Sequence, residues 1–200
     1  YNRVGPILTE IDKAEVEAAG GIISAQVVTF QTGFNPGALP NWNGYLQAVT
    51  ESATRNQLIA TIAQRSAAKM PTLILTERIE HAEAIHQLAG GVLLHGQLRK
   101  SEREAAMAAA QDAPLTIGTT GLLGEGIDVA GWQALILASP ISNRGRLLQA
   151  IGRVIRPKEG KHSGFVADLV DDHGFSVSSY RKREQVYLER GYPITMRQGA

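Results

Sequence analysis

The chain has no cysteine, which excludes a disulfide framework and zinc sites built on cysteine. It has no apolar run near the roughly 20 residues of a membrane-spanning helix, so we expect no membrane segment. Neither sign of charge is in excess: 20 Lys and Arg stand against 19 Asp and Glu. Any nucleic-acid contact therefore requires a local basic patch. The lack of cysteine fits a reducing compartment, and we expect a cytoplasmic protein.

Short catalytic motifs are also missing. The sequence contains no G-x-x-x-x-G-K-[ST] phosphate loop, no D-E-x-H or D-E-A-D tetrad, no H-E-x-x-H zinc motif and no G-x-S-x-G nucleophile elbow. The chain thus lacks the groups that usually hold a nucleoside triphosphate and its Mg²⁺. Its 200 residues begin with Tyr1 rather than Met, and we expect a piece of a longer protein.

Apolar runs alternate with helical patterns along most of the chain. The apolar runs predict strands at residues 22–30, 72–75, 92–94, 115–119, 134–138 and 165–170. Helical spacing predicts helices at residues 11–19, 54–70, 79–88 and 144–151, and a capping box at Ser101 and Glu104 opens another. This alternation predicts an α/β fold in which helices cover both faces of a parallel sheet.

We divide the chain into three parts. Residues 1–50 are expected to form a connector or partial subdomain, residues 51–172 the α/β domain, and residues 173–200 a charged helical tail. The carboxyl ends of parallel strands share one edge of a sheet, and ligand sites form there. The segments that follow the predicted strands are therefore the candidates for function.

An arginine pair lies at the end of the predicted helix 144–151. The run Gln149-Ala150-Ile151-Gly152-Arg153-Val154-Ile155-Arg156 places two arginines three residues apart on one face of a helix or helical turn. Gly152 removes a side chain beside them, so another surface can approach closely. Planar guanidinium groups suit a phosphate that gains negative charge during phosphoryl transfer. A solvated basic helix end is the alternative interpretation.

A glycine-rich segment, Gly118 to Asp128, includes the end of the predicted strand 115–119. Its glycines permit unusual backbone angles and a concave array of N–H donors, and Thr119 and Thr120 add hydroxyls. Asp128 is able to accept a hydrogen bond from a sugar hydroxyl or to orient an arginine. A flexible loop and a dinucleotide fingerprint are the alternatives, but the spacing is not G-x-G-x-x-G.

Four segments resemble, in order, the motifs of superfamily-2 helicases. Residues 119–128 look like motif V, and residues 149–156 fit motif VI, Q-x-x-G-R-x-x-R. Residues 72–83 resemble motif IV, and His95-Gly96 followed by Arg103-Glu104 resembles motif IVa. The resemblance implies the second, C-terminal RecA-like motor domain: a parallel sheet of about five or more strands with helices on both faces, an N-terminal connector and a C-terminal helix.

The resemblance covers about Arg55 to Asp168 and also indicates a branch of the family. Arg55-Asn56 and the Arg-Ile-x-His run at 78–81 are similar to the DNA-directed branch of XPB-like repair helicases and phage recombination helicases. DEAD-box RNA helicases usually carry Arg in place of Glu125 and His in place of Gln149. The resemblance therefore favours DNA, single-stranded or branched, over RNA.

The resemblance further implies roles for individual residues. Arg153 and Arg156 would contact the γ-phosphate of ATP as arginine fingers, with Gln149 at the same interface. Gly126 and Asp128 would lie against the ribose. A third group would hold the nucleic-acid backbone: Thr119, Thr120, Arg78, His95 and Gly96. ATP and Mg²⁺ would be bound mainly by the N-terminal RecA-like domain of the same protein.

We therefore expect the second motor domain of an ATP-dependent DNA helicase or translocase, acting in repair or recombination and inactive alone. A non-catalytic nucleic-acid-binding module of the same fold and a Rossmann-type nucleotide-binding domain are the alternatives. Asp171-Asp172 is interpreted as a solvated loop rather than a Mg²⁺ site. Four aromatic residues are interpreted as core or rim packing rather than as base-stacking platforms: Trp42, Tyr45, Trp132 and Tyr180.

Overall fold

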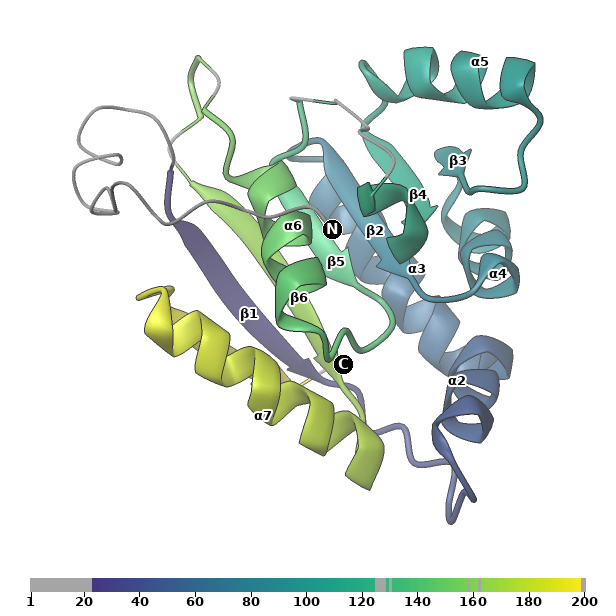
Figure 1. The fold of residues 1–200 in the computed structure, drawn as a ribbon, viewed down its shortest axis with the longest axis vertical. Helices are drawn as coiled ribbons and strands as arrows, with labels where there is room; N and C mark the ends of the chain where they lie inside the picture. The colour runs from purple at the N-terminus through teal and green to yellow at the C-terminus, as the bar shows by residue number, and fades with distance from the viewer. Residues whose placement is uncertain (1–22, 125–128, 130, 158, 162, 199–200) are drawn as a thin grey trace, which may run out of the picture.

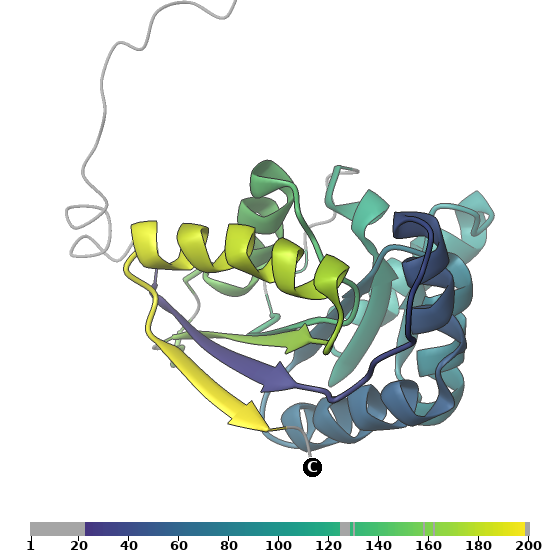
Figure 2. The ribbon, with the colours of Figure 1, turned by 90° about the horizontal axis from the view of Figure 1, so that it is seen from below.

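The computed structural model describes residues 23–124, 129, 131–157, 159–161 and 163–198, which form one sheet with helices on both faces (Figures 1 and 2). The elements in chain order are β1 (Ala25–Gln31), α2 (Trp42–Glu51), α3 (Ala53–Ala67), β2 (Thr72–Thr76), α4 (Ile79–Ala89), β3 (Val92–Leu94), α5 (Lys100–Ala110), β4 (Leu115–Thr119), the 3₁₀ helix η1 (Thr120–Gly124), β5 (Ala134–Leu137), α6 (Arg144–Val154), β6 (Gly164–Val170), α7 (Gly174–Glu189) and β7 (Ile194–Gln198).

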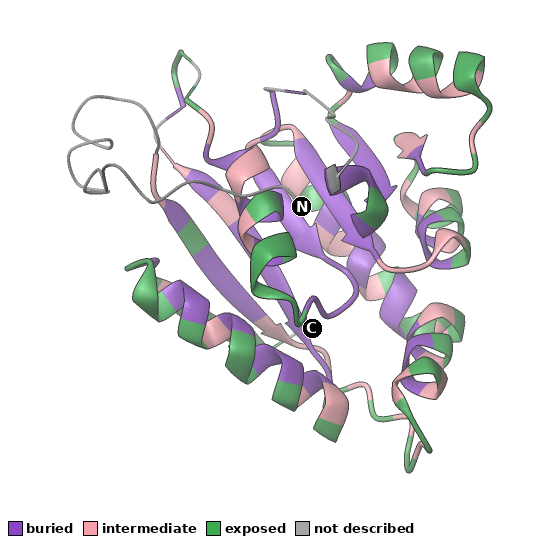
Figure 3. Ribbon diagram, in the orientation of Figure 1, coloured by how far each residue is buried: buried purple, intermediate pink, exposed green. Residues whose placement is uncertain are grey.

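The seven strands lie in the order β3-β4-β2-β5-β6-β1-β7, and all neighbours are parallel. The central strands β2, β4 and β5 are buried along their whole length, which explains why their sequences hold no charged residue and only threonine as a polar one (Figure 3). The α/β fold predicted from the sequence, with a parallel sheet covered on both faces, is confirmed.

Two hydrophobic cores lie on opposite faces of the sheet. On one face α6, α7 and η1 pack against alternate strand residues such as Leu75, Leu135 and Val166. On the other face α3 and α4 pack against the intervening residues, among them Ile74 and Ile136. Helix α2 contacts α4, and α5 contacts the edge strand β3. The segments that follow the strands are therefore positioned by a central sheet packed on both faces.

Three local features differ from the sequence-based expectation. Strand β7 was not predicted, because it is an edge strand whose residues are mostly exposed and therefore partly polar. Helix α2 was not predicted either; it begins after Asn41, whose side chain accepts a hydrogen bond from the Gly44 amide at 2.9 Å. The capping box lies two residues earlier than predicted, because Glu102, rather than Glu104, reaches back to the Arg99 amide at 3.0 Å.

The flanks of the domain contribute to the same sheet. Strand β1, within the predicted connector, lies between β6 and β7, and the predicted helical tail contains α7 followed by β7. Residues 1–22, including the predicted helix 11–19, lie outside the described residues. Within the part of the chain that the structure describes, no helix combines the length and apolarity needed to cross a membrane.

Candidate functional site

Three of the candidate segments meet at one edge of the sheet. Thr119, the last residue of β4, is the register partner of Thr76 at the end of β2. On the other side of β4, Gly118 is paired with Leu94, the last residue of β3. The segments that begin at Glu77, His95 and Thr120 therefore follow neighbouring parallel strands at their carboxyl ends, as the sequence predicts.

Arg78 extends this edge to a helix that the sequence analysis missed. Its guanidinium donates to the Gln47 side chain and, at 3.3 Å, to the backbone oxygen of Asn43 in α2. The side chain is only half-buried, so it stays accessible from the solvent side. Gln47 and Asn43 are both exposed. Helix α2 thus adds polar groups beside a residue predicted to contact a nucleic-acid backbone.

The other predicted backbone contacts are less exposed. Thr119 and Thr120 are 7% and 6% exposed, because they connect β4 to η1 inside the fold. His95 is also buried, and its Nδ1 atom has no hydrogen-bond partner among the described residues. Gly96, which follows it, is exposed. At this edge Gly96 and Arg78 are therefore the most accessible of the predicted backbone contacts.

Helix α6 carries the predicted arginine-finger segment on the side facing away from the core. Leu147, Ala150, Ile151 and Val154 are its buried face. Gln149 is exposed and Gly152 and Arg153 are half-exposed, and their i, i+3, i+4 spacing places them on one line along the helix. 

Arg153 also joins the two predicted motif segments. Its Nη2 atom donates to the Leu123 carbonyl in η1 at 3.3 Å. The glycine-rich segment after β4 and the arginine-bearing helix are thus adjacent in the fold. Gly126 and Asp128, predicted to lie against a ribose, are outside the described residues.

Arg156 lies just beyond α6, and a buried lysine fixes this turn. The Nζ atom of Lys161 donates to the Arg156 carbonyl at 2.9 Å and to the Trp132 carbonyl at 2.8 Å. Lys161 is 6% exposed. The Arg156 side chain is half-buried. No sequence pattern indicated this positioning role of Lys161.

The segment that leads into α6 is held by side chains from three other helices. Arg55 of α3 donates to the Ala138 carbonyl at 2.8 Å, and His81 of α4 lies 3.2 Å from the Ser139 hydroxyl. Arg183 of α7 lies 3.4 Å from the Ile141 carbonyl. These buried contacts fix the start of the helix that carries Gln149 and Arg153.

Asp171 holds Arg55, the first of these three side chains. The interpretation of Asp171 as part of a solvated loop is therefore wrong. The residue is fully buried. Its carboxylate accepts hydrogen bonds from Arg55 Nε at 2.8 Å, from the Thr32 hydroxyl at 2.5 Å and from the Tyr45 hydroxyl. Burial is the larger cause and the charge of Asp171 the second cause of a raised pKa of Tyr45, so the hydroxyl stays protonated and donates.

The aromatic residues also have structural environments. Tyr45 stacks on His173 with ring centroids 5.0 Å apart, and Trp42 lies edge-on to Phe175 at 6.1 Å. Trp132 is buried and donates from Nε1 to the Thr116 hydroxyl at 3.2 Å. Tyr180 is buried as well. The interpretation of Trp42, Tyr45, Trp132 and Tyr180 as core or rim residues is confirmed.

His81 is a neutral link between α3, α4 and the segment before α6. Asn56 donates from Nδ2 to the Thr50 carbonyl at 2.9 Å, which directs its Oδ1 atom toward His81 Nε2 at 3.0 Å. The Nε2 atom of His81 therefore carries the proton, and Nδ1 accepts from Ser139. Burial first, and then the charge of Arg55, lower the pKa of His81 to about 3.

This pKa predicts acid-dependent destabilisation through His81. Because the folded-state pKa of about 3 lies below the ordinary value of about 6.5, protons favour the unfolded chain. The stability contribution of the neutral imidazole is complete above about pH 6.5 and falls by up to about 1.4 kcal/mol per pH unit as pH decreases toward 3. Urea unfolding of the unaltered chain and of His81→Gln is expected to give free energies that converge from pH 7 to pH 4. His86→Gln, on the same helix, should keep the acid dependence of the unaltered chain, and a pH-independent gap for His81→Gln would contradict the assignment.

Two glycines near α6 have different reasons to be glycine. A Cβ atom on Gly164 of β6 would lie 2.5 Å from the Val154 carbonyl oxygen and 2.9 Å from Ile155 Cγ2, so the glycine lets the end of α6 approach the sheet. A Cβ atom on Gly152 would meet no described atom within 4 Å. Gly152 therefore weakens its helix without any packing need among the described residues.

Alanine substitutions at these two positions should have opposite effects on stability. Gly164→Ala is expected to lower the free energy of unfolding by about 1–3 kcal/mol, because the backbone of α6 has to shift. Gly152→Ala is expected to raise it by about 0.5–1 kcal/mol, because alanine favours the helical backbone. Urea denaturation of the two variants measures both. A destabilised Gly152→Ala would show that this face of α6 is already packed.

The fold and the paired motif segments define a RecA-like α/β domain of the helicase type. The protein family described as "Helicase conserved C-terminal domain" matches residues 53–158, more than half of the chain. The chain belongs to this family, and it is a superfamily-2 helicase C-terminal domain similar to that of UvsW.

Individual relatives agree with this membership. The "ATP-dependent DNA helicase uvsW" of Enterobacteria phage T4 is 25% identical over 152 residues, which are 72% of this chain and 30% of that protein. The crystal structure of T4 UvsW superposes with a TM-score of 0.68 at 19% identity, over 87% of this chain and 41% of that one. A Saccharomyces cerevisiae Dbp5 variant, described as bound to RNA and ADP BeF3, gives 0.63 at 14% identity, over 88% and 42%. The chain spans 25% and 30% of the lengths of the two curated viral relatives it matches.

Proposed function

We propose that this chain is the second motor domain of an ATP-dependent DNA helicase or translocase. In this proposal Arg153 and Arg156 complete an ATP site whose other wall, including the Mg²⁺ ligands, belongs to a preceding RecA-like domain. Bound ATP would supply the phosphoanhydride bond whose cleavage drives movement along DNA. Residues at the carboxyl edge of the sheet, including Arg78 and Gly96, would contact the DNA backbone.

One observation carries the proposal: the outer line of α6 presents Gln149, Gly152 and Arg153 together, next to η1. Gly152 is unexplained by any contact of the described chain, and a glycine costs helix stability. Arg153 is held by a neutral carbonyl in η1 and is half-exposed. A planar guanidinium beside a gap in the helix surface suits close approach by a phosphate-bearing partner surface.

The chain alone is expected to show no detectable ATP hydrolysis. It has neither a phosphate loop nor an acidic tetrad in its sequence, so the groups that position the phosphates and Mg²⁺ would come from elsewhere. The measurement is phosphate release by the purified 200-residue chain with ATP, Mg²⁺ and a dT20 oligonucleotide. Robust turnover would contradict the proposal.

A second arm uses the full-length protein and separates a motor from a non-catalytic module. Gly152→Leu introduces a side chain into space that no described atom occupies, and leucine favours a helix, so the isolated chain should lose no stability. In the full-length protein the same change should strongly lower ATP turnover, because it obstructs the interface. Gly174→Leu is the control, since its Cβ would also meet no described atom, but it lies at the start of α7.

A further inference from the structure

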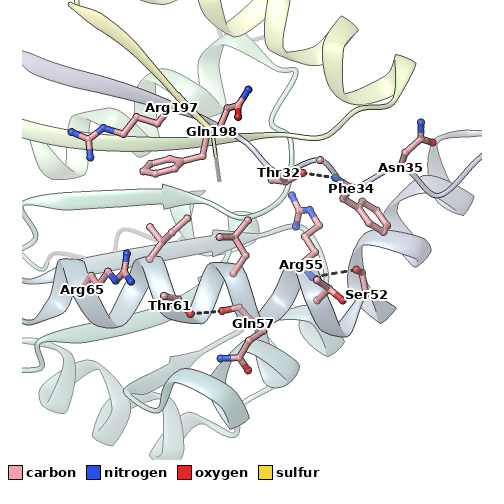
Figure 4. Close-up of a pocket in the computed structure, with 15 residues that line it drawn as sticks. Thr32, Phe34, Asn35, Ser52, Arg55, Gln57, Thr61, Arg65, Arg197 and Gln198 are labelled. Carbon is pink, nitrogen blue, oxygen red and sulfur yellow. Dashed lines mark hydrogen bonds between the residues drawn. The ribbon is translucent and has the colours of Figure 1, made fainter. Parts of the chain in front are cut away.

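A groove lies beside β1 and β7, on the opposite side of the sheet from β3 and β4. Its first part, of about 940 Å³, lies between α3 and the ends of β1 and β7 (Figure 4). Its second part, of about 370 Å³, continues along α3 toward Met70. The two parts share four lining residues and are therefore continuous: Phe30, Ile62, Arg65 and Arg197.

The groove exists because no described helix covers this part of the sheet. Phe30 of β1 is paired with Arg197 of β7 and with Leu169 of β6, so these side chains share one face. Helices α3 and α4 pack on the same face but over β2 and β4. The strands at this end are thus left open beside the flank of α3.

The charges along the groove are of one sign. Arg65 comes from α3, Lys69 from the turn that follows α3, and Arg197 from β7, and all three are exposed. Figure 4 shows Arg65 and Arg197 on opposite walls at the end away from Asn35. Among the described residues that line either part, none carries a carboxylate. The chain has a net charge of only +1, so this is a local basic patch rather than a bulk effect.

One nitrogen of a buried guanidinium in the groove wall has no acceptor among the described residues. Arg55 lines the groove, and its side chain extends from α3 toward Thr32 (Figure 4). Asp171 and the Ala138 carbonyl satisfy Nε and Nη1, but Nη2 has no hydrogen-bond partner among the described residues. A buried donor without an acceptor costs free energy. Arg55 thus leaves one uncompensated donor in the wall beside the groove.

Aromatic rings lie along the same groove. Phe34 lines the first part, Phe165 the second part, and Phe30 both, and each ring is half-buried. Neutral hydrogen-bonding side chains complete the lining of the first part: Asn35, Ser52, Thr54, Gln57, Thr61 and Gln198. Basic groups that track a backbone, with aromatic rings on which bases stack, are the combination that binds single-stranded nucleic acid.

We propose that the groove between α3 and the β1–β7 end of the sheet binds a segment of single-stranded nucleic acid, separately from the edge formed by β3, β4 and β2. Arg65, Lys69 and Arg197 contact its phosphates, and Phe30, Phe34 and Phe165 contact its bases. Strand β5 separates the strands that line this groove, β6, β1 and β7, from β2 in the sheet. The site therefore adds to the backbone contacts under the proposed function and does not replace them.

The test is fluorescence anisotropy of fluorescein-labelled dT20 with the 200-residue chain at several salt concentrations. The double charge reversal Arg65→Glu/Arg197→Glu is expected to weaken binding at least about tenfold at low salt. It should also reduce the slope of log K against log salt by about 1.4, which corresponds to two lost phosphate contacts on a single strand. The matched control Arg181→Glu/Lys182→Glu changes two exposed cations on α7, across the sheet, and should leave affinity nearly unchanged. Circular dichroism checks that all variants are folded.

Further arms distinguish the groove from the edge and from an acidic peptide site. The groove reversal should weaken binding in an Arg78→Glu background as well. Phe34→Leu should weaken dT20 binding without changing the salt slope, because it removes stacking but no charge. Equal effects of groove and control reversals, no binding of dT20 by the unaltered chain, or equal competition by polyglutamate of the same length would each overturn the inference. The ATP hydrolysis tests above are independent of all these results.

Discussion

Asp168→Ala is expected to lower the free energy of unfolding by about 3–5 kcal/mol, because it leaves a buried arginine charge without a partner. Arg183 is 1% exposed, and it donates to both oxygens of the Asp168 carboxylate at 2.8 Å. Tyr187 donates to the same carboxylate at 2.8 Å. Burial lowers the pKa of Arg183, but the charge and hydrogen bonds of Asp168 outweigh it and the net pKa is raised.

Thermal unfolding and urea denaturation measure this effect, with an expected decrease in Tm of roughly 6–20 °C for a domain of this size. The control removes the charged cluster at once: Asp168→Leu, Arg183→Met and Tyr187→Phe together should cost less than Asp168→Ala alone, since no buried charge is left unpaired. A loss below about 1 kcal/mol for Asp168→Ala would show that the guanidinium finds another partner or water.

The cluster of Asp168, Arg183 and Tyr187 also connects α7 to the segment that leads into α6. Arg183 reaches the Ile141 carbonyl, in the segment that leads into α6. Together with Arg55 and His81 it fixes this segment from three directions. A helix with apolar residues on one face is held laterally by packing, but its axial position depends on its ends. These buried polar contacts therefore set where Gln149 and Arg153 lie.

The sheet was predictable because its central strands are buried on both faces. Strands such as β2 and β4 have to be short apolar runs, and such runs are visible in the sequence without any knowledge of neighbours. Edge strand β7 was not predicted for the converse reason: it has only one neighbouring strand, and most of its side chains are exposed. Helix α2 was not predicted because it is short and directly follows a segment rich in glycine and proline, which indicates a loop.

The buried polar anchors were not predictable from spacing. Asp171 and Arg55 are 116 residues apart, and Arg55 and Asn56 were noted only as similar to a family branch. The structure gives these two residues a physical role: Arg55 holds Asp171 and Ala138, and Asn56 orients His81. By contrast, residues 119–128 and 149–156 could be identified as motif candidates because their glycines and arginines are clustered in the sequence. The structure brings η1 and α6, which carry parts of these segments, into contact.

The proposed role of Arg153 as an arginine finger predicts a large loss of ATP turnover in the full-length protein. Arg153→Ala in the full-length protein is expected to lower ATP turnover on the order of 10³-fold while ATP binding is largely retained, because the guanidinium stabilises charge that develops in the transition state. Arg153→Lys should recover only part of the rate, since an ammonium keeps the charge but not the planar pair of donors. The measurements are steady-state phosphate release and equilibrium binding of a fluorescent ATP analogue.

Two controls separate this role from a structural one. Arg146→Ala removes an exposed arginine from the first turns of the same helix and should leave turnover close to that of the unaltered protein. Arg153→Ala also removes the hydrogen bond to the Leu123 carbonyl, so the free energy of unfolding of the isolated chain is measured beside turnover. If the variant stays folded in the assay, a decrease in turnover on the order of 10³-fold reflects a lost arginine finger and not unfolding. Unchanged turnover in Arg153→Ala would instead assign Arg153 to the solvated end of a helix and remove the main support for the motor-domain proposal.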